Sequence, residues 1–430
     1  VLCWRSFDLP ERNTMKKIQE LQQVKGDAYD YYIAGNEDTD LFEKIFLVDD
    51  IVEEICKPDK YFLIGEKGSG KTAYSVYMSK SDKINSFCSI SLVENTLYQR
   101  FLNMKRQKAL ELSSFKDVWI NLIYLILAEK IRKEYGETFF SSIKYKQLSK
   151  AIDVFYSDAF KPEFVNAFEF VDNASASINS MMKQGLFSTG TKASAETSQK
   201  YVEQSFQISL LKIRDGFEKA FMSVNLKKPT ILFVDGIDAR PRDIDNEQYF
   251  ECLVGLVNAV LEMNQSFLKE KQIKIMLLIR PDIMYKMPVH NMNQKLRNNS
   301  VLLNWVTSYR KYIDSKLFKI ADDYFMKQQD YSYELGECWN YYFPYKVEYQ
   351  EKWKAPDNPF VEFLRYSLYK PRDILTMLNE MVDATSGTQF KHSDFEGILS
   401  NYSTYLKGEL KDYMLIYTVS YTHLTLPTIY

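Results

Sequence analysis

Eight consecutive residues near the start of the chain have the types and spacing to hold a phosphate group. Residues 65–72 read GEKGSGKT and fit the pattern G-x-x-x-x-G-K-[ST]. The glycines let the backbone curl so that successive N–H groups point at phosphate oxygens, and a following helix adds its positive end. Lys71 would place a charge on the β- and γ-phosphates, and the Thr72 hydroxyl would bind Mg²⁺. The predicted ATP-binding residues are Gly65, Glu66, Lys67, Gly68, Ser69, Gly70, Lys71 and Thr72.

A second apolar segment ends in acids that could complete such a site. The sequence ILFVDGID, residues 231–238, places Asp235 directly after four apolar residues. A carboxylate there would hold Mg²⁺, directly or through water, opposite Thr72. The alternative is a strand that simply ends in an Asp-Gly turn. Asp238 is the candidate for polarising the attacking water, and its structural alternative is to cap the next segment.

Arginines bear on whether such a site could hydrolyse ATP. Charge that accumulates on the γ-phosphate needs a donor that stays protonated. Arg280 follows the apolar segment IKIMLLI, at the edge where α/β sheets bind ligands. Arg240 and Arg242 closely follow the strand that ends at Asp235. For each of these arginines the alternative is a solvated surface charge.

Arg372 is predicted at an unusual place for a cation. In KPRDILTMLNEM, Pro371 suits the first turn of a helix. The helix dipole disfavours a cation there. We therefore expect either a local pair with Asp373 or an anionic partner such as a nucleotide phosphate. The helix itself is predicted from an apolar stripe made of Ile374, Leu375, Leu378, Met381 and Val382.

The elements around these residues predict an α/β fold. Apolar runs predict strands at KYFLIG, SFCSISL, TILFVD and QIKIMLLI, and a weaker one at SVLLNWV. Helical periodicity predicts helices after residue 70, at residues 116–135 and 202–225, and over most of the chain beyond residue 306. This alternation predicts a three-layer fold, in which helices cover both faces of a parallel sheet, followed by a helical lid.

We expect four parts along the chain. Residues 1–26 form an N-terminal extension, part of which could be upstream read-through because the first methionine is Met15. Residues 27–306 form the nucleotide-binding domain, with an insertion around residues 137–203 that includes a Ser-, Ala- and Gly-rich segment. Residues 307–417 form the helical lid. Residues 418–430 resemble a transposon-end sequencing adapter translated in frame, so we exclude them from fold reasoning.

Composition narrows the classes of function. The net charge of −2 gives no global basic field for nucleic acid or an anionic membrane. Three histidines make a His-built metal site or a Ser-His-Asp triad improbable. Five cysteines, far apart in sequence, indicate reduced thiols in a cytoplasmic protein. No apolar run is long enough to span a membrane, so we expect no membrane partner.

Together these motifs resemble the AAA+/STAND branch of P-loop NTPases, over roughly residues 27–410. The closest likeness is to poorly characterised bacterial P-loop ATPases, and DGID is similar to the NACHT-type magnesium motif. The resemblance implies that Lys71 and Thr72 are the Walker A pair and Asp235 the Walker B acid. It places Arg280 near the sensor 1 position and Arg372 near sensor 2.

The chain also departs from this family's pattern. Gly236 stands where typical AAA+ hydrolases have Glu, and Ala239 stands where the NACHT pattern ends in a further Glu. The sensor 1 residue is usually small and polar, whereas Arg280 occupies that position here. These departures imply slow or partner-triggered hydrolysis rather than a motor.

The leading functional hypothesis is a Mg²⁺-dependent, ATP-driven conformational switch, which the resemblance places in signalling or defence. One alternative is an ATPase acting on nucleic acid in repair or mobile-element processing, since NMKRQK and SSIKYKQLSK are basic and lie among aromatic residues. Another is a small-molecule kinase with an acceptor pocket. We also expect an unidentified protein partner. The chain could form a homo-oligomer in which an arginine such as Arg242 acts in trans.

Overall fold

The structure is a computed structural model of the chain, and it describes eight ranges of residues. These are residues 15–33, 36–93, 115–140, 145–158, 210–237, 246–287, 292–348 and 356–414. The chain divides into two compact units. The sheet unit comprises Asp50–Glu66 and Tyr74–Leu303, and the helical unit comprises Val1–Asp49, Lys67–Ala73 and Asn304–Tyr430.

A five-stranded parallel sheet forms the centre of the sheet unit, in the order β2-β3-β4-β1-β5. This confirms the predicted parallel α/β sheet, although the last strand is shorter than SVLLNWV. Both faces of β3 and β4 are buried, as their largely apolar sequences predict, and the charged Lys274 of β4 is buried with them. The strands are β1 Phe62–Ile64, β2 Phe87–Leu92, β3 Thr230–Asp235, β4 Ile273–Ile279 and β5 Ser300–Leu302.

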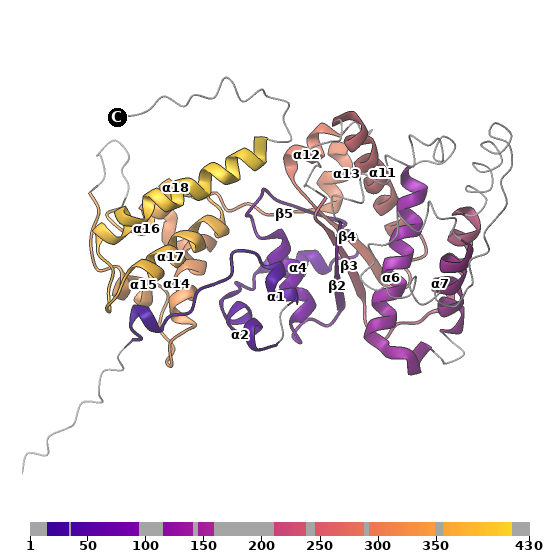
Figure 1. Ribbon diagram of the computed structural model, residues 1–430, viewed down its shortest axis with the longest axis horizontal. Helices are drawn as coiled ribbons and strands as arrows, with labels where there is room; N and C mark the ends of the chain where they lie inside the picture. The colour runs from indigo at the N-terminus through magenta and orange to yellow at the C-terminus, as the bar shows by residue number, and fades with distance from the viewer. Residues whose placement is uncertain are drawn as a thin grey trace, which may run out of the picture. The chain divides into compact units, whose positions relative to one another are not determined.

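Helices cover both faces of this sheet. In Figure 1, α4 lies on one face of the sheet, and α6 and α11 lie on the other. The connection from β1 to β2 runs across the sheet in the opposite direction to the later ones, and right-handed crossovers therefore place its helix on the opposite face. The helices are α3 Asp50–Cys56, α4 Lys71–Lys80, α6 Phe115–Phe140, α7 Lys146–Asp158, α11 Asn246–Asn264, α12 Pro281–Lys286, α13 Met292–Asn299 and one at residues 210–223.

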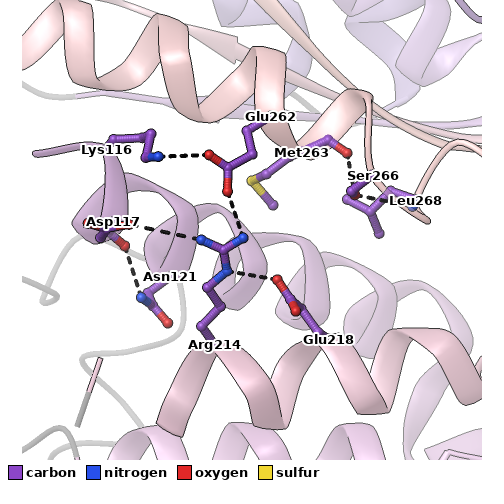
Figure 2. A network of polar contacts seen from close by, with 9 residues as sticks. All are labelled: Lys116, Asp117, Asn121, Arg214, Glu218, Glu262, Met263, Ser266 and Leu268. Carbon is purple, nitrogen blue, oxygen red and sulfur yellow. Dashed lines mark hydrogen bonds and ion pairs between the residues drawn. The ribbon is translucent and has the colours of Figure 1, made fainter. Parts of the chain in front are cut away.

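The helices on the α6 face pack closely at a glycine and are linked by a network of ion pairs. A Cβ on Gly255 of α11 would lie 2.6 Å from the Cβ of Phe115, so the close approach of α11 to α6 requires glycine. Figure 2 shows the network, in which Arg214 lies at the centre. Its guanidinium donates to Glu218 on its own helix and to Glu262 on α11. The network therefore connects helix 210–223 to its neighbour in the same layer.

The helical unit has an aromatic core. Trp339 stacks on Phe343, with ring centroids 4.1 Å apart, and meets Phe360 edge to face. Most of the described residues beyond residue 306 lie in helices, which confirms the prediction for this part of the chain. The elements are η1 Ile18–Glu20, α1 Tyr29–Ile33, α2 Asn36–Ile45, η2 Tyr309–Asp314, α14 Lys316–Met326, α15 Glu337–Tyr342, α16 Phe360–Tyr366, α17 Pro371–Ala384 and α18 His392–Met414.

Several boundary predictions fall partly or wholly outside the described residues. This holds for residues 1–14, for the tail at 418–430 and for most of the insertion, of which residues 145–158 contain α7. Residues 27–49, which we assign from the sequence to the nucleotide-binding domain, belong to the helical unit. The domain boundaries after residues 26 and 306 stay predictions.

Candidate functional site

The glycine-rich loop joins β1 to α4, as its sequence predicts. β1 ends at Ile64 and α4 begins at Lys71. The Gly65 N–H donates to the carbonyl of Ile279 at 3.2 Å, so the loop leaves the sheet beside the end of β4. By compactness, Gly65 and Glu66 belong to the sheet unit, whereas Lys67–Ala73 belong to the helical unit.

Two glycines in the loop adopt conformations that other residues rarely take. Gly68 has φ 80° and Gly70 has φ 91°. At Gly68 a Cβ would also lie 3.3 Å from the Cβ of Arg372. Both positions therefore need glycine for the turn, and Gly68 needs it for the close approach of another segment as well.

Two polar residues of the loop are buried, whereas Glu66 is exposed. Lys71 is 7% exposed, and Ser69 is 2% exposed. The Ser69 hydroxyl has no hydrogen-bond partner, although its backbone carbonyl accepts from the indole N–H of Trp305 at 2.9 Å. A buried hydroxyl without a partner is costly, so a ligand that accepted its hydrogen bond would be stabilised here.

Arg372 lies against the loop, in the helical unit. The described part of α17 begins at Pro371, as predicted, and the Arg372 N–H donates to the carbonyl of Gly68 at 3.3 Å. The guanidinium of Arg372 lies 3.9 Å from the carboxylate of Glu409. The expected local pair with Asp373 is wrong, because that carboxylate turns away and accepts from Leu368 and Tyr405.

The reason for this correction is burial. Asp373 is 3% exposed, and burial raises the pKa of its carboxyl despite two hydrogen bonds. It therefore belongs to the interior of α17, on the same side as the apolar stripe. Met377 is buried in that stripe, whereas Leu375 is only half-buried.

Lys67 of the loop pairs with α18, which lies beside α17 (Figure 1). Its ammonium is 2.9 Å from Glu409 and 2.8 Å from Asp412. Sequence reasoning missed Glu409, Asp412 and Trp305. No local signal marks them, because they lie more than 200 residues from the loop along the chain.

In the sheet unit, Asp235 ends β3, at the same edge of the sheet as the end of β1. Its side chain is buried, and one carboxylate oxygen accepts from the N–H of Gly236 at 2.8 Å. Gly236 has φ 82°, and a Cβ there would lie 2.9 Å from the carbonyl oxygen of Val93. This backbone has no space for a larger side chain at position 236.

Arg280 lies at the carboxyl end of β4, as predicted, and is buried. Its guanidinium makes a two-bond ion pair with Asp282, at 3.0 and 2.7 Å. Both side chains are less than a tenth exposed. Asp282 stands in the first turn of α12, where the helix dipole favours an acid. The remaining candidates, Asp238, Arg240 and Arg242, lie outside the described residues.

Within the described ranges, no three His, Cys, Asp or Glu side chains gather as metal ligands, and no helix has the length and hydropathy to cross a membrane. Cys56, Cys88, Cys252 and Cys338 are free thiols. No family model, curated protein or solved structure matches the chain.

Proposed function

We propose that this chain binds ATP and Mg²⁺ through residues 65–72 and hydrolyses the nucleotide, and that this reaction drives a conformational switch. The place of the loop carries the proposal. The loop follows β1, whose connection leads to β2 at one edge of the sheet. The neighbouring strand β4 connects to β5 at the other edge, so the two connections run in opposite directions. Open α/β sheets bind ligands at such a switch point, outside the carboxyl ends of the strands. A helix follows the loop directly and supplies its N-terminal N–H groups.

The loop residues fit a phosphate group. Gly68 and Gly70 adopt left-handed backbone conformations, and a backbone that curls around an anion uses such conformations. The unpartnered hydroxyl of Ser69 can donate to a phosphate oxygen, and Lys71 at the start of α4 can neutralise charge. Arg372, in contact with Gly68, can add a second cation.

The Thr72 hydroxyl and the Asp235 carboxylate would hold Mg²⁺, which when bound neutralises charge on the phosphates. The N–H of Gly236 fixes the orientation of the Asp235 carboxylate. No side chain at position 236 can act on the attacking water, so that task would pass to Asp238. We therefore propose slow hydrolysis, or hydrolysis triggered by a partner.

Three variants test this proposal in the full chain. Lys71→Ala should weaken ATP binding by about 10- to 100-fold, the loss expected for a charge-assisted hydrogen bond. Asp235→Ala should abolish release of free phosphate. The control Lys57→Ala makes the same change at an exposed lysine outside the loop and should alter neither. The proposal fails if the wild-type protein binds no ATP, or if Lys71→Ala binds it equally well.

A further inference from the structure

One carboxylate, that of Glu409 on α18, is shared between two cations beside the loop. One of its oxygens lies 2.9 Å from the ammonium of Lys67, and the other lies 3.9 Å from the guanidinium of Arg372. Asp412, one turn further along the helix, makes a second pair with Lys67 at 2.8 Å. All four residues belong to the helical unit.

These two cations flank the backbone that would receive the phosphates. Lys67 is itself part of the loop, and Arg372 contacts Gly68 through backbone and Cβ. Glu409 is 23% exposed, so solvent screens its charge only partly. A carboxylate at this place repels a triphosphate and keeps both cations occupied.

We infer that Glu409 is an internal competitor of the nucleotide and sets the affinity of the loop for ATP. Without nucleotide, its carboxylate pairs with Lys67 and Arg372. The phosphates of ATP replace it on these cations, and the α18 contact with the loop weakens. This inference rests on the proposed ATP binding. Because binding free energies are reciprocal, the factor by which Glu409 weakens ATP binding is the factor by which ATP weakens the Glu409 contact.

The test compares Glu409→Gln with Glu396→Gln. Both remove one negative charge from α18 and keep the shape of the side chain, but Glu396 pairs with His392, not with the loop. Titration with ATP and Mg²⁺, followed by calorimetry, should give about fivefold tighter binding for Glu409→Gln, as expected for one partly exposed ion pair. The affinity of Glu396→Gln should equal that of the wild type. The gain should shrink at high salt and in a Lys67→Ala background.

A second readout follows the helix itself. ATP should speed amide exchange in the last turns of α18 in the wild type, and should have little effect there in Glu409→Gln. ATP binding that is equal or weaker in Glu409→Gln overturns the inference and leaves the proposed function standing. If neither protein binds ATP, both are overturned.

Discussion

At the scale of single residues, Lys274 is a charge placed inside the sheet. It lies in β4, is 7% exposed, and donates to the carbonyl oxygens of Ile55 and Lys57. Those carbonyls end α3, where helix C-termini favour a cation. Burial nevertheless disfavours the ammonium and lowers the pKa of Lys274 to about 8. The residue thus caps a helix at an electrostatic cost.

This cost predicts a pH dependence of stability. The pKa of Lys274 rises to its ordinary value of 10.5 on unfolding, so between about pH 8 and that value the unfolded chain binds more protons. The contribution of Lys274 to the free energy of unfolding should then rise with pH across this window, by on the order of 3 kcal/mol. Lys274→Met removes the titrating group, and its urea-unfolding free energy should lack that rise.

Burial also raises the pKa of Cys88 and Cys252 to about 12, so these thiols lower the free energy of unfolding as the pH rises through the same window. The test therefore compares the pH profile of the variant with that of the wild type rather than absolute stabilities. Lys271→Met, at a half-buried lysine just before the same strand, should keep the wild-type profile. Parallel profiles for wild type and Lys274→Met would contradict the prediction.

At the scale of elements, the network of Figure 2 decides how firmly helix 210–223 is attached. Arg214 bonds Glu218 at 2.7 Å and Glu262 at 2.6 Å, and Lys116 of α6 pairs with the same Glu262 at 2.8 Å. Although burial acts in the opposite direction, hydrogen bonds from Lys116 and Arg214 lower the pKa of Glu262. Three helices therefore share one set of charges.

Arg214→Met should cost about 1–2 kcal/mol in the free energy of unfolding, because it leaves two partly buried carboxylates close together. The matched control is Lys219→Met on the same helix, whose pair with Asp215 is mostly exposed and should contribute almost nothing. Chemical denaturation measures both. Equal costs for the two variants would show that the network adds nothing beyond a surface ion pair.

At the scale of the whole molecule, the first described residues are fastened to helices more than 300 residues away. The N–H of Val24 donates to the side-chain oxygen of Asn379 in α17 at 3.2 Å, and the Asn379 amide donates to the carbonyl of Val24 at 2.6 Å. Gln328, just beyond α14, holds Gln22 in the same two-bond manner. The amides bind the backbone as a neighbouring strand would.

Asn379→Ala should therefore destabilise the helical unit by about 1–3 kcal/mol and expose residues 15–25 to proteases. Asn401→Ala, at an exposed position in α18, makes the same substitution in a helix and controls for helix propensity. Denaturant unfolding and limited proteolysis measure the two effects. An unchanged proteolysis pattern at residues 15–25 would argue against this role for Asn379.

What the sequence determined by itself is local. Largely apolar runs predict the strands, because a strand covered on both faces is mostly apolar, and Lys274 in β4 is an exception. The glycines at positions 68 and 70 predict the turn of the loop, because they permit left-handed conformations. Pro371 predicts the start of α17. These signals act within a few residues, so no partner elsewhere in the chain is needed to recognise them.

What only the tertiary structure decided is which distant groups meet. The pairs of Lys67 with Glu409 and Asp412, the bond from Trp305 to Ser69 and the burial of Asp373 depend on packing between segments far apart in sequence. Asp282 beside Arg280 is near in sequence, yet their pairing follows from burial at the end of β4. No periodic or positional signal in the sequence marks such contacts. A charged residue is the same letter in the sequence whether its side chain is solvated or paired with a distant partner.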